Sequence, residues 1–286
     1  MEFYLLFTLA ILANLPIGFI ALKKKSLRVP DGVITAAITG MFVFLAHPVL
    51  WGLLLSFFVS SSYLSKYKEA TNEKSTAMLY AEKGGQRDSL QVIANGGPAL
   101  IGSLLVIYKM GLFENDYFSP LFLFIAISFA SSTADTWATE IGTTSKSDPR
   151  WIFNLNKSVP KGTSGAVSLL GTTATALGAI FIAILYAIFV IIGTQEISID
   201  IGLFIILISV GGFLGSLIDT MLGASYQSVY QCPKCDKKTE KRKHRHSESI
   251  TTTHVTGFRW LNNDMVNFLS SFLSSLFITF IYWIYF

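Results

Sequence analysis

Apolar segments alternate with short polar segments along the whole chain. Eight of them are each roughly the 15–25 residues that an α-helix needs to cross a bilayer, and they lie near residues 3–22, 31–46, 48–65, 90–108, 118–142, 164–193, 200–222 and 263–285. The second and third are short and joined by little more than His47 and Pro48, which is typical of a broken or tilted pair. The pattern predicts an all-α polytopic membrane protein with about eight transmembrane helices, in which residues 1–286 form a single integral membrane domain.

The composition excludes an ordinary soluble domain. Hydrophobic residues make up 51% of the chain and charged residues only 14%, and the mean hydropathy is +0.52, as expected of a membrane protein. Glu2 precedes the first apolar segment and lysines follow it, which reverses the charge order of a secretory signal peptide. We therefore expect this first helix to be retained.

The basic residues predict an orientation. If the N-terminus lies outside, every Lys and Arg except Lys109 falls in an inside loop. Because inside loops are enriched in basic residues, this favours both termini outside, all long loops in the cytosol, and a multi-pass protein of the cell membrane. The net charge of +4 then reflects topology, and no binding of nucleic acid is expected.

Polar residues recur near the predicted cytosolic ends of the spans. They are Asn95, Gly96 and Gly97 in the fourth span, Asp135, Thr136, Thr139 and Glu140 in the fifth, Asp219 in the seventh, and Asn263, Asp264 and Asn267 in the eighth. A carboxylate in a transmembrane segment is costly and by default marks a functional site. The pattern predicts a site on the cytosolic face; a snorkelling or capped helix end is the structural alternative.

Two of these spans contain similar segments. Residues 129–136, FASSTADT, and residues 213–220, FLGSLIDT, share the pattern F-x-small-S-x-x-D-T. Both segments lie on helices that run from outside to inside in the predicted topology. Duplicated halves with facing sites would give such a pattern, as in many transporters, so an internal duplication is one interpretation.

A segment rich in glycine and hydroxyl groups precedes the sixth span. It contains Lys157, Lys161, Gly162, Thr163, Ser164 and Gly165. Free amides at a helix N-terminus favour an anion, and two lysines would add charge for phosphate. The alternative is a capped helix start in a basic inside loop, with Thr163 or Ser164 as the cap. The chain contains neither G-x-x-x-x-G-K-[ST] nor G-x-G-x-x-G, which excludes those two nucleotide-binding motifs.

The carboxylates beside this segment suggest a hard divalent cation. Asp135, Glu140, Asp219 and Asp264 are the candidate Mg²⁺ ligands, because Mg²⁺ takes one or two carboxylates and completes its shell with phosphates and water. Such a site suits phosphoryl transfer, in which catalysis is mostly positioning and charge neutralisation. Nothing in the chain resembles a Ser-His-Asp arrangement.

A metal knuckle is predicted in the cytosolic loop of residues 223–262. Cys232 and Cys235 form a C-x-x-C pair, and His244 and His246 follow, so the four would complete a tetrahedral Zn²⁺ site. The histidines are spaced more tightly than in a zinc finger, so His254 competes for the fourth position. A basic surface loop with incidental cysteines is the alternative.

Together, these motifs resemble one membrane family. The segments GQRDSLQVIANGG, SSTADTWATEIG, VPKGTSGAVSLLG, GSLIDTMLGASYQ and RWLNNDMVN, between about residues 85 and 271, are similar to the family that contains the plant phytyl-phosphate kinase of vitamin E synthesis and animal transmembrane protein 19. Bacterial members carry a His-Cys pair after the C-x-x-C, where this chain has His244-Arg-His246, so the zinc ligands stay open.

The resemblance implies a kinase that moves a phosphoryl group from a nucleoside triphosphate, with CTP expected, to an isoprenoid monophosphate such as phytyl phosphate. We expect catalysis by Asp135, Glu140, Asp219 and Asp264, which would hold Mg²⁺, and by Lys161. The expected substrate-binding residues are Arg87, Asn95, Gly96, Gly97, Thr136, Thr139, Lys157, Gly162, Thr163, Ser164, Gly165, Asn263 and Asn267.

Two other classes remain alternatives. A lipid-phosphate transporter or flippase would share the buried carboxylates and the internal repeat without using a nucleotide. A CDP-alcohol transferase would carry a denser run of aspartates on consecutive helical turns, and no such run occurs in this chain. It ranks third for that reason.

Overall fold

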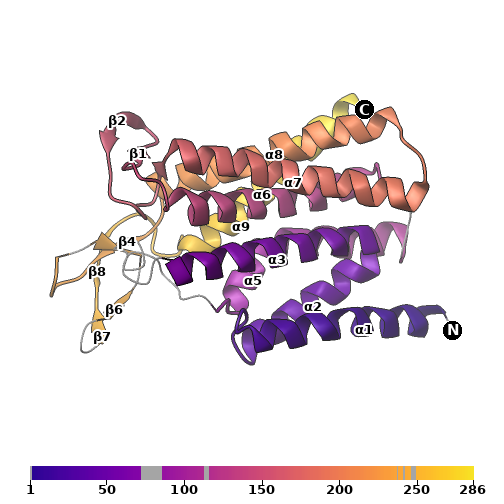
Figure 1. Cartoon of the computed structure of the whole chain (residues 1–286), viewed down its shortest axis with the longest axis horizontal. Coiled ribbons are helices and arrows are strands. Elements are labelled where there is room, and N and C mark those ends of the chain that lie inside the picture. The colour runs from indigo at the N-terminus through magenta and orange to yellow at the C-terminus, as the bar shows by residue number, and fades with distance from the viewer. Residues whose placement is uncertain (1, 72–85, 113–115, 237, 241, 246–248) are drawn as a thin grey trace.

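The computed structural model describes residues 2–71, 86–112, 116–236, 238–240, 242–245 and 249–286 (Figure 1). Helices account for most of these residues: α1 Glu2–Lys23, α2 Asp31–Ala46, α3 Pro48–Thr71, α5 Ser89–Met110, α6 Pro120–Gly142, α7 Leu169–Thr194, α8 Ile199–Ser225 and α9 Asn263–Tyr285. All of them except α2 are long and apolar enough to cross a membrane, and α2 has 16 residues. The predicted class of helical membrane protein with about eight helices is confirmed.

Side-chain caps fix where several helices begin. Asp88 and Gln91 form a capping box that starts α5, and Ser119 accepts from the Phe122 amide at the start of α6. Such caps satisfy backbone donors that the first helical turn leaves without partners. With these caps, α5 and α6 begin within a few residues of the positions expected from hydropathy.

Helix α6 lies at the centre of the bundle and packs against α3, α5, α7, α8 and α9. Its residues 122–134 are all buried. Glycines on α8 allow close approach, since an added Cβ at Gly212 would lie 2.7 Å from the Ala130 Cβ. The apolar residues around α6 form one continuous core with residues from α2, α3, α5, α7, α8 and α9.

Short antiparallel strands lie in two of the loops, a feature that hydropathy does not predict. The first loop contains β1 Arg150–Trp151, β2 Asn154–Ser158 and β3 Ala166–Val167, in the order β2-β1-β3. The second contains β4 Val229–Gln231, β5 Lys238–Thr239, β6 Lys243–Arg245, β7 Ser249–Thr251 and β8 Thr253–Thr256, as sheets β5-β4-β8 and β6-β7.

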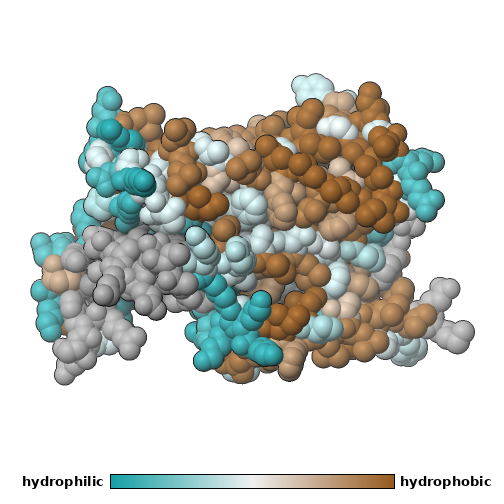
Figure 2. All heavy atoms as spheres, viewed as in Figure 1, coloured by the Kyte–Doolittle hydropathy of each residue, from teal (hydrophilic) through white to brown (hydrophobic). Residues whose placement is uncertain are grey.

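The strands lie together at one end of the bundle, and both termini lie at the other end (Figure 1). Figure 2 shows a hydrophobic surface over the middle of the helices and hydrophilic residues toward the ends. Termini on one side and strand-bearing loops on the opposite side agree with the topology expected from the basic residues. Which side faces the cytosol stays a prediction.

Cysteine labelling tests that orientation. Lys146 and Asp116 are both exposed and belong to loops predicted to lie on opposite sides. In a background with Cys232 and Cys235 replaced by serine, we expect a cysteine at position 116 to react with a membrane-impermeant maleimide in intact cells. A cysteine at position 146 should react only after permeabilisation. The reverse pattern would overturn the predicted orientation.

Candidate functional site

A polar cavity of about 540 Å³ lies at the strand end of the bundle. Most of the predicted site residues line it: Arg87, Asn95, Asp135, Thr136, Thr139, Glu140, Lys161, Gly162, Thr163, Ser164, Gly165, Asp219, Asn263, Asp264 and Asn267. Residues from α5, α6, α8, α9 and the loop before α7 thus meet at one place. Most of the polar residues near the predicted cytosolic ends of the spans therefore line one cavity.

Asp135 of α6 and Asp219 of α8 lie near each other in the cavity. Their carboxyl groups are close enough to interact electrostatically. Ser216 Oγ donates to Asp135 Oδ1 at 3.4 Å, and Ser270 Oγ donates to Asp219 Oδ2 at 3.1 Å. Two neighbouring carboxylates repel each other unless a proton or a cation binds between them. The pair is therefore a candidate binding site for a cation.

Glu140 contacts a different part of the cavity. It accepts a hydrogen bond of 2.7 Å from Ser65 Oγ and interacts electrostatically with Arg87. Burial lowers the pKa of Arg87 to about 10, and the Glu140 carboxylate opposes that shift. The guanidinium therefore stays charged at neutral pH. Five residues correspond to about 140° around a helix, so Glu140 and Asp135 point in different directions from α6.

The carboxylates do not form a closed metal cage. Within the described ranges, no three His, Cys, Asp or Glu side chains converge to hold a metal ion. Asp264 is buried in the first turn of α9 and lines the cavity. Oxygen donors of this kind suit Mg²⁺, which usually takes one or two carboxylates and receives its other ligands from phosphates and water. The donor set therefore fits a cation that arrives with a phosphorylated substrate.

The loop before α7 differs from the expected helix start. Helix α7 begins at Leu169 with Ser168 as its cap, not near residue 164. Gly162 and Gly165 have φ angles of 84° and 81°, and the Thr163 amide donates to the Pro160 carbonyl at 3.2 Å. The segment is therefore a series of turns, and neither Thr163 nor Ser164 caps the helix. The actual N-terminal turn of α7 still faces the cavity through Ser168 and Gly171.

The two predicted lysines lie in different places. Lys161 lines the cavity and its Nζ donates to the Ser145 carbonyl. Lys157 lies on the exposed strand β2, with its Nζ 5.4 Å from the centre of the Trp151 ring, and it does not line the cavity. The structure thus brings only Lys161 to the other candidate residues.

Asn95, Gly96 and Gly97, which were predicted together, have different surroundings in the structure. Asn95 lines the cavity and donates to the Gln91 carbonyl at 3.0 Å. Gly97 faces α9, where an added Cβ would lie 2.8 Å from Phe268, so it is a close-packing position. Gly96 lines a second, apolar cavity instead.

Several residues of the site were not predicted. Gln227 and Glu240 are two of them: the predicted Ser164 has its Oγ 3.1 Å from Gln227 Oε1 and 3.0 Å from Glu240 Oε1, within hydrogen-bond distance of both, which joins the two strand-bearing loops beside the cavity. The repeated segment contained the signal for Ser216, since its serine is shared with Ser132. Glu240 had no such signal, because it lies in a basic loop far from α6 in the sequence.

The C-x-x-C pair lies in a turn after β4. Cys232 is buried, Cys235 is partly buried, and the Asp236 amide donates to the Cys232 carbonyl at 2.9 Å. His244 belongs to β6, and His246 lies outside the described residues. His254 of β8 lies against Tyr230, and its buried Nε2 has no hydrogen-bond partner among the residues that the structure describes. The zinc site stays a prediction, with His254 as a competing ligand.

Elemental analysis tests the zinc prediction. Protein purified without chelator should contain about one zinc per chain, and a C232S/C235S variant should lose it. A C235S variant with full zinc content, or wild-type protein without zinc, would leave the cysteines as ordinary thiols. Manganese and iron measured in the same samples control for non-specific metal.

Comparison with known proteins places this chain in a family of membrane proteins. A family model described as "Integral membrane protein DUF92" matches residues 12–275. Protein PGR of Arabidopsis thaliana is 31% identical over 96% of this chain and 94% of its own length. Protein VTE6, chloroplastic, of the same plant is 28% identical over 86% of this chain and 62% of its own length. An uncharacterized membrane protein of Methanocaldococcus jannaschii is 30% identical over 72% of this chain and 77% of its own length. No solved structure matches the chain.

Proposed function

The chain belongs to the integral membrane protein family DUF92, and we propose that it transfers a phosphoryl group from a nucleoside triphosphate, preferably CTP, to an isoprenoid monophosphate. One observation carries the proposal: Asp135, Asp219, Lys161 and Arg87 all line a single polar cavity at one end of the membrane helices. The resemblance to the family that contains phytyl-phosphate kinase supplies the substrate class.

In this proposal, the carboxylate pair binds the cation. Asp135 and Asp219 would hold Mg²⁺, which when bound neutralises charge on the nucleotide phosphates. Ser216 and Ser270 donate to the two carboxylates and so fix their orientation. Asp264 lines the same cavity and would bind a water of the metal shell.

Cationic and dipolar groups would bind the phosphates. Lys161 and the N-terminal turn of α7 line one part of the cavity and would bind the nucleotide phosphates, because helix N-termini favour anions. Arg87 lines another part and would bind the acceptor phosphate. Glu140, through its interaction with Arg87, would then position that guanidinium, in place of its expected role as a metal ligand.

The acceptor chemistry makes few demands on the protein. An isoprenoid monophosphate is already an anionic nucleophile, so no side chain has to remove a proton from it. Alignment and charge neutralisation then make up most of the catalysis. Asn95, Thr136, Thr139 and Asn263 line the cavity and would complete the polar lining around the two phosphate groups.

The chain is a multi-pass integral membrane protein, and we place it in the cell membrane with the cavity toward the cytosol. The name of one relative, Protein VTE6, chloroplastic, assigns that relative to a chloroplast. The labelling experiment described above tests both parts of this assignment, because position 116 reacts in intact cells only if the chain lies in the cell membrane with that loop outside.

The direct test is an activity matrix. Purified protein is incubated with CTP, ATP, GTP or UTP and with phytyl, geranylgeranyl or farnesyl monophosphate, and diphosphate products are detected by mass. We expect a prenyl diphosphate that forms only with both a nucleotide and Mg²⁺. Absence of product in every combination, together with nucleotide-independent movement of prenyl phosphate across vesicles, would favour the lipid-phosphate transporter.

A further inference from the structure

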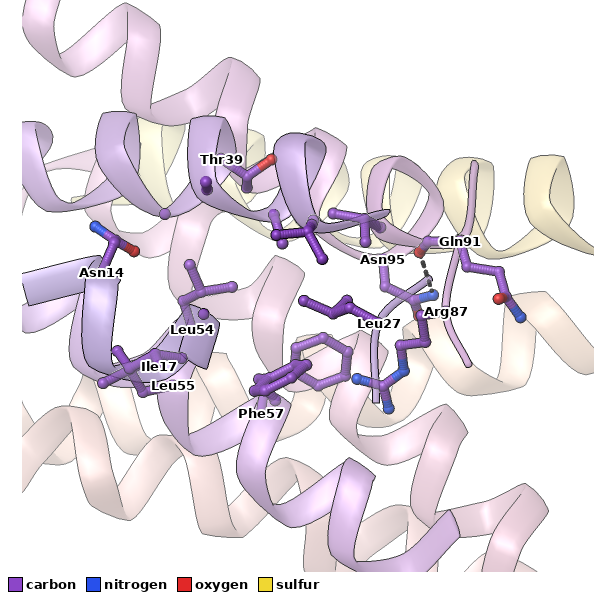
Figure 3. Close-up of a pocket in the computed structure, with 18 residues that line it drawn as sticks. Asn14, Ile17, Leu27, Thr39, Leu54, Leu55, Phe57, Arg87, Gln91 and Asn95 are labelled. Atoms are coloured by element: carbon purple, nitrogen blue, oxygen red, sulfur yellow. Dashed lines mark hydrogen bonds between the residues drawn. The ribbon is translucent and has the colours of Figure 1, made fainter. Parts of the chain in front are cut away.

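A second cavity, of about 100 Å³, lies among α1, α2, α3 and α5 (Figure 3). Its lining is mostly apolar and includes Leu27, Val33, Ala36, Leu54 and Phe57. We call it the apolar groove. It lies on the side of the bundle away from α7 and α8 (Figure 1). All of its lining residues lie between Asn14 and Gly96.

The apolar groove is continuous with the polar cavity. Arg87, Gln91 and Asn95 line both of them, and Figure 3 shows the three side by side at one end of the groove. An apolar surface therefore ends at a group of polar side chains that also faces the carboxylates and Lys161. This geometry suits a ligand with an apolar chain and a polar head.

Arg87 places a charged guanidinium at that junction, where it also interacts with the Glu140 carboxylate, and it holds a fixed position. Its guanidinium carbon lies 5.5 Å and 5.6 Å from the ring centres of Phe57 and Phe58. Its backbone amide donates to the Ser26 carbonyl at 3.0 Å, and its carbonyl accepts from the Arg28 amide at 2.9 Å. The aromatic rings and the loop between α1 and α2 thus hold one charged group where the groove meets the polar cavity.

We propose that the apolar groove binds the first part of the hydrocarbon chain of an isoprenoid monophosphate, with the phosphate at Arg87. The assignment rests on the proposed function for the identity of the ligand, and on the groove for its position. A guanidinium at the end of an apolar lining complements a phosphate at the end of an apolar chain. Neither inorganic phosphate nor an uncharged prenyl alcohol would use both parts of this surface.

Binding without nucleotide tests the groove. Full-length protein in nanodiscs is titrated with radiolabelled phytyl monophosphate, and phytol and inorganic phosphate are the comparison ligands. Ala36 lines the groove, whereas Ile38 of the same helix is 46% exposed and does not line it. We expect A36F to raise the Kd for phytyl monophosphate by about tenfold or more, in the range that pocket contacts produce, and the matched control I38F to leave it unchanged. Equal affinity of A36F and I38F overturns the assignment.

Substitutions at Arg87 test the position of the phosphate. We expect R87Q to bind phytyl monophosphate no better than phytol, and R87K to recover part of the difference. An R87Q variant that still prefers the monophosphate as strongly as wild type also overturns the assignment.

A smaller substitution serves if A36F does not fold. An added Cβ at Gly96 would lie 3.4 Å from Thr39 Cγ2, an ordinary contact, so G96A should fold. G96A should weaken the binding of phytyl monophosphate and leave the binding of CTP unchanged. If folded G96A binds phytyl monophosphate as well as wild type does, the result counts against the groove. Because the titrations with phytyl monophosphate contain no nucleotide, groove binding without kinase activity rejects only the proposed function. Kinase activity with an A36F variant that behaves like I38F rejects only the groove.

Discussion

Replacing Asp135 with asparagine is expected to reduce the turnover of prenyl monophosphate a few hundred-fold, which corresponds to ~3–4 kcal/mol of transition-state stabilisation. Asparagine keeps the size of the side chain and can still accept the hydrogen bond from Ser216. It removes the negative charge that would face Mg²⁺, so the transferring phosphates lose part of their neutralisation. The loss should appear in kcat rather than in folding.

The matched control is Asp200→Asn. Asp200 lies exposed in the first turn of α8, far along the helix from Asp219, and we expect this variant to retain activity. Product formation is measured at saturating nucleotide and Mg²⁺, and folding is judged from the elution profile in detergent. If Asp135→Asn elutes as wild type and keeps full activity, the carboxylate has a structural role and the transporter hypothesis gains weight.

Substitution of Gly212 by valine is expected to destabilise the protein by ~1–3 kcal/mol or more, the usual effect of overpacking a close contact. A Cβ at this position would lie 2.7 Å from the Ala130 Cβ and 2.9 Å from the Ala179 Cβ. Helix α8 must therefore move away from α6 and α7. That movement would also separate Asp219 from Asp135, so activity should fall along with stability.

The same helix offers a control for the helix propensity of valine. At Gly202 of α8, no atom of another described residue lies within 4 Å of an added Cβ, so Gly202→Val should change the thermal midpoint little. The midpoint is measured by light scattering or intrinsic fluorescence in one detergent for both variants. Equal midpoints for the two variants would contradict the close packing of α6 and α8.

Hydropathy was enough to predict the helices but not the loops. The spans are long runs of apolar residues, so their existence follows from the energetics of the bilayer. The start of α7 was placed about five residues too early because residues 164–168 are small or apolar. In the structure Ala166 and Val167 pair with β1, and pairing between distant segments leaves no periodic signal in so short a strand.

The sequence predicted many of the residues that line the polar cavity, but not which of them contact one another. Asp135 and Asp219 share a repeated segment, and α6 and α8 do pack together, although an ancient duplication remains an interpretation. Glu140 shares α6 with Asp135, yet its partners are Ser65 and Arg87, which come from α3 and the loop before α5. Which face of a helix meets which neighbour depends on tertiary packing, and a single sequence does not encode it locally.

The enclosure of α6 has a consequence for how the chain is made. Among the helices recognised as spans in the described part of the chain, α6 has the lowest mean hydropathy and the largest buried share. Insertion into a membrane depends on the hydrophobicity of the segment as it leaves the translocon, when α7, α8 and α9 have not yet been synthesised. The helix that carries Asp135 therefore enters the bilayer with a weak signal of its own. We expect truncation after α6 to leave it poorly inserted, and the helices that follow to retain it in the membrane.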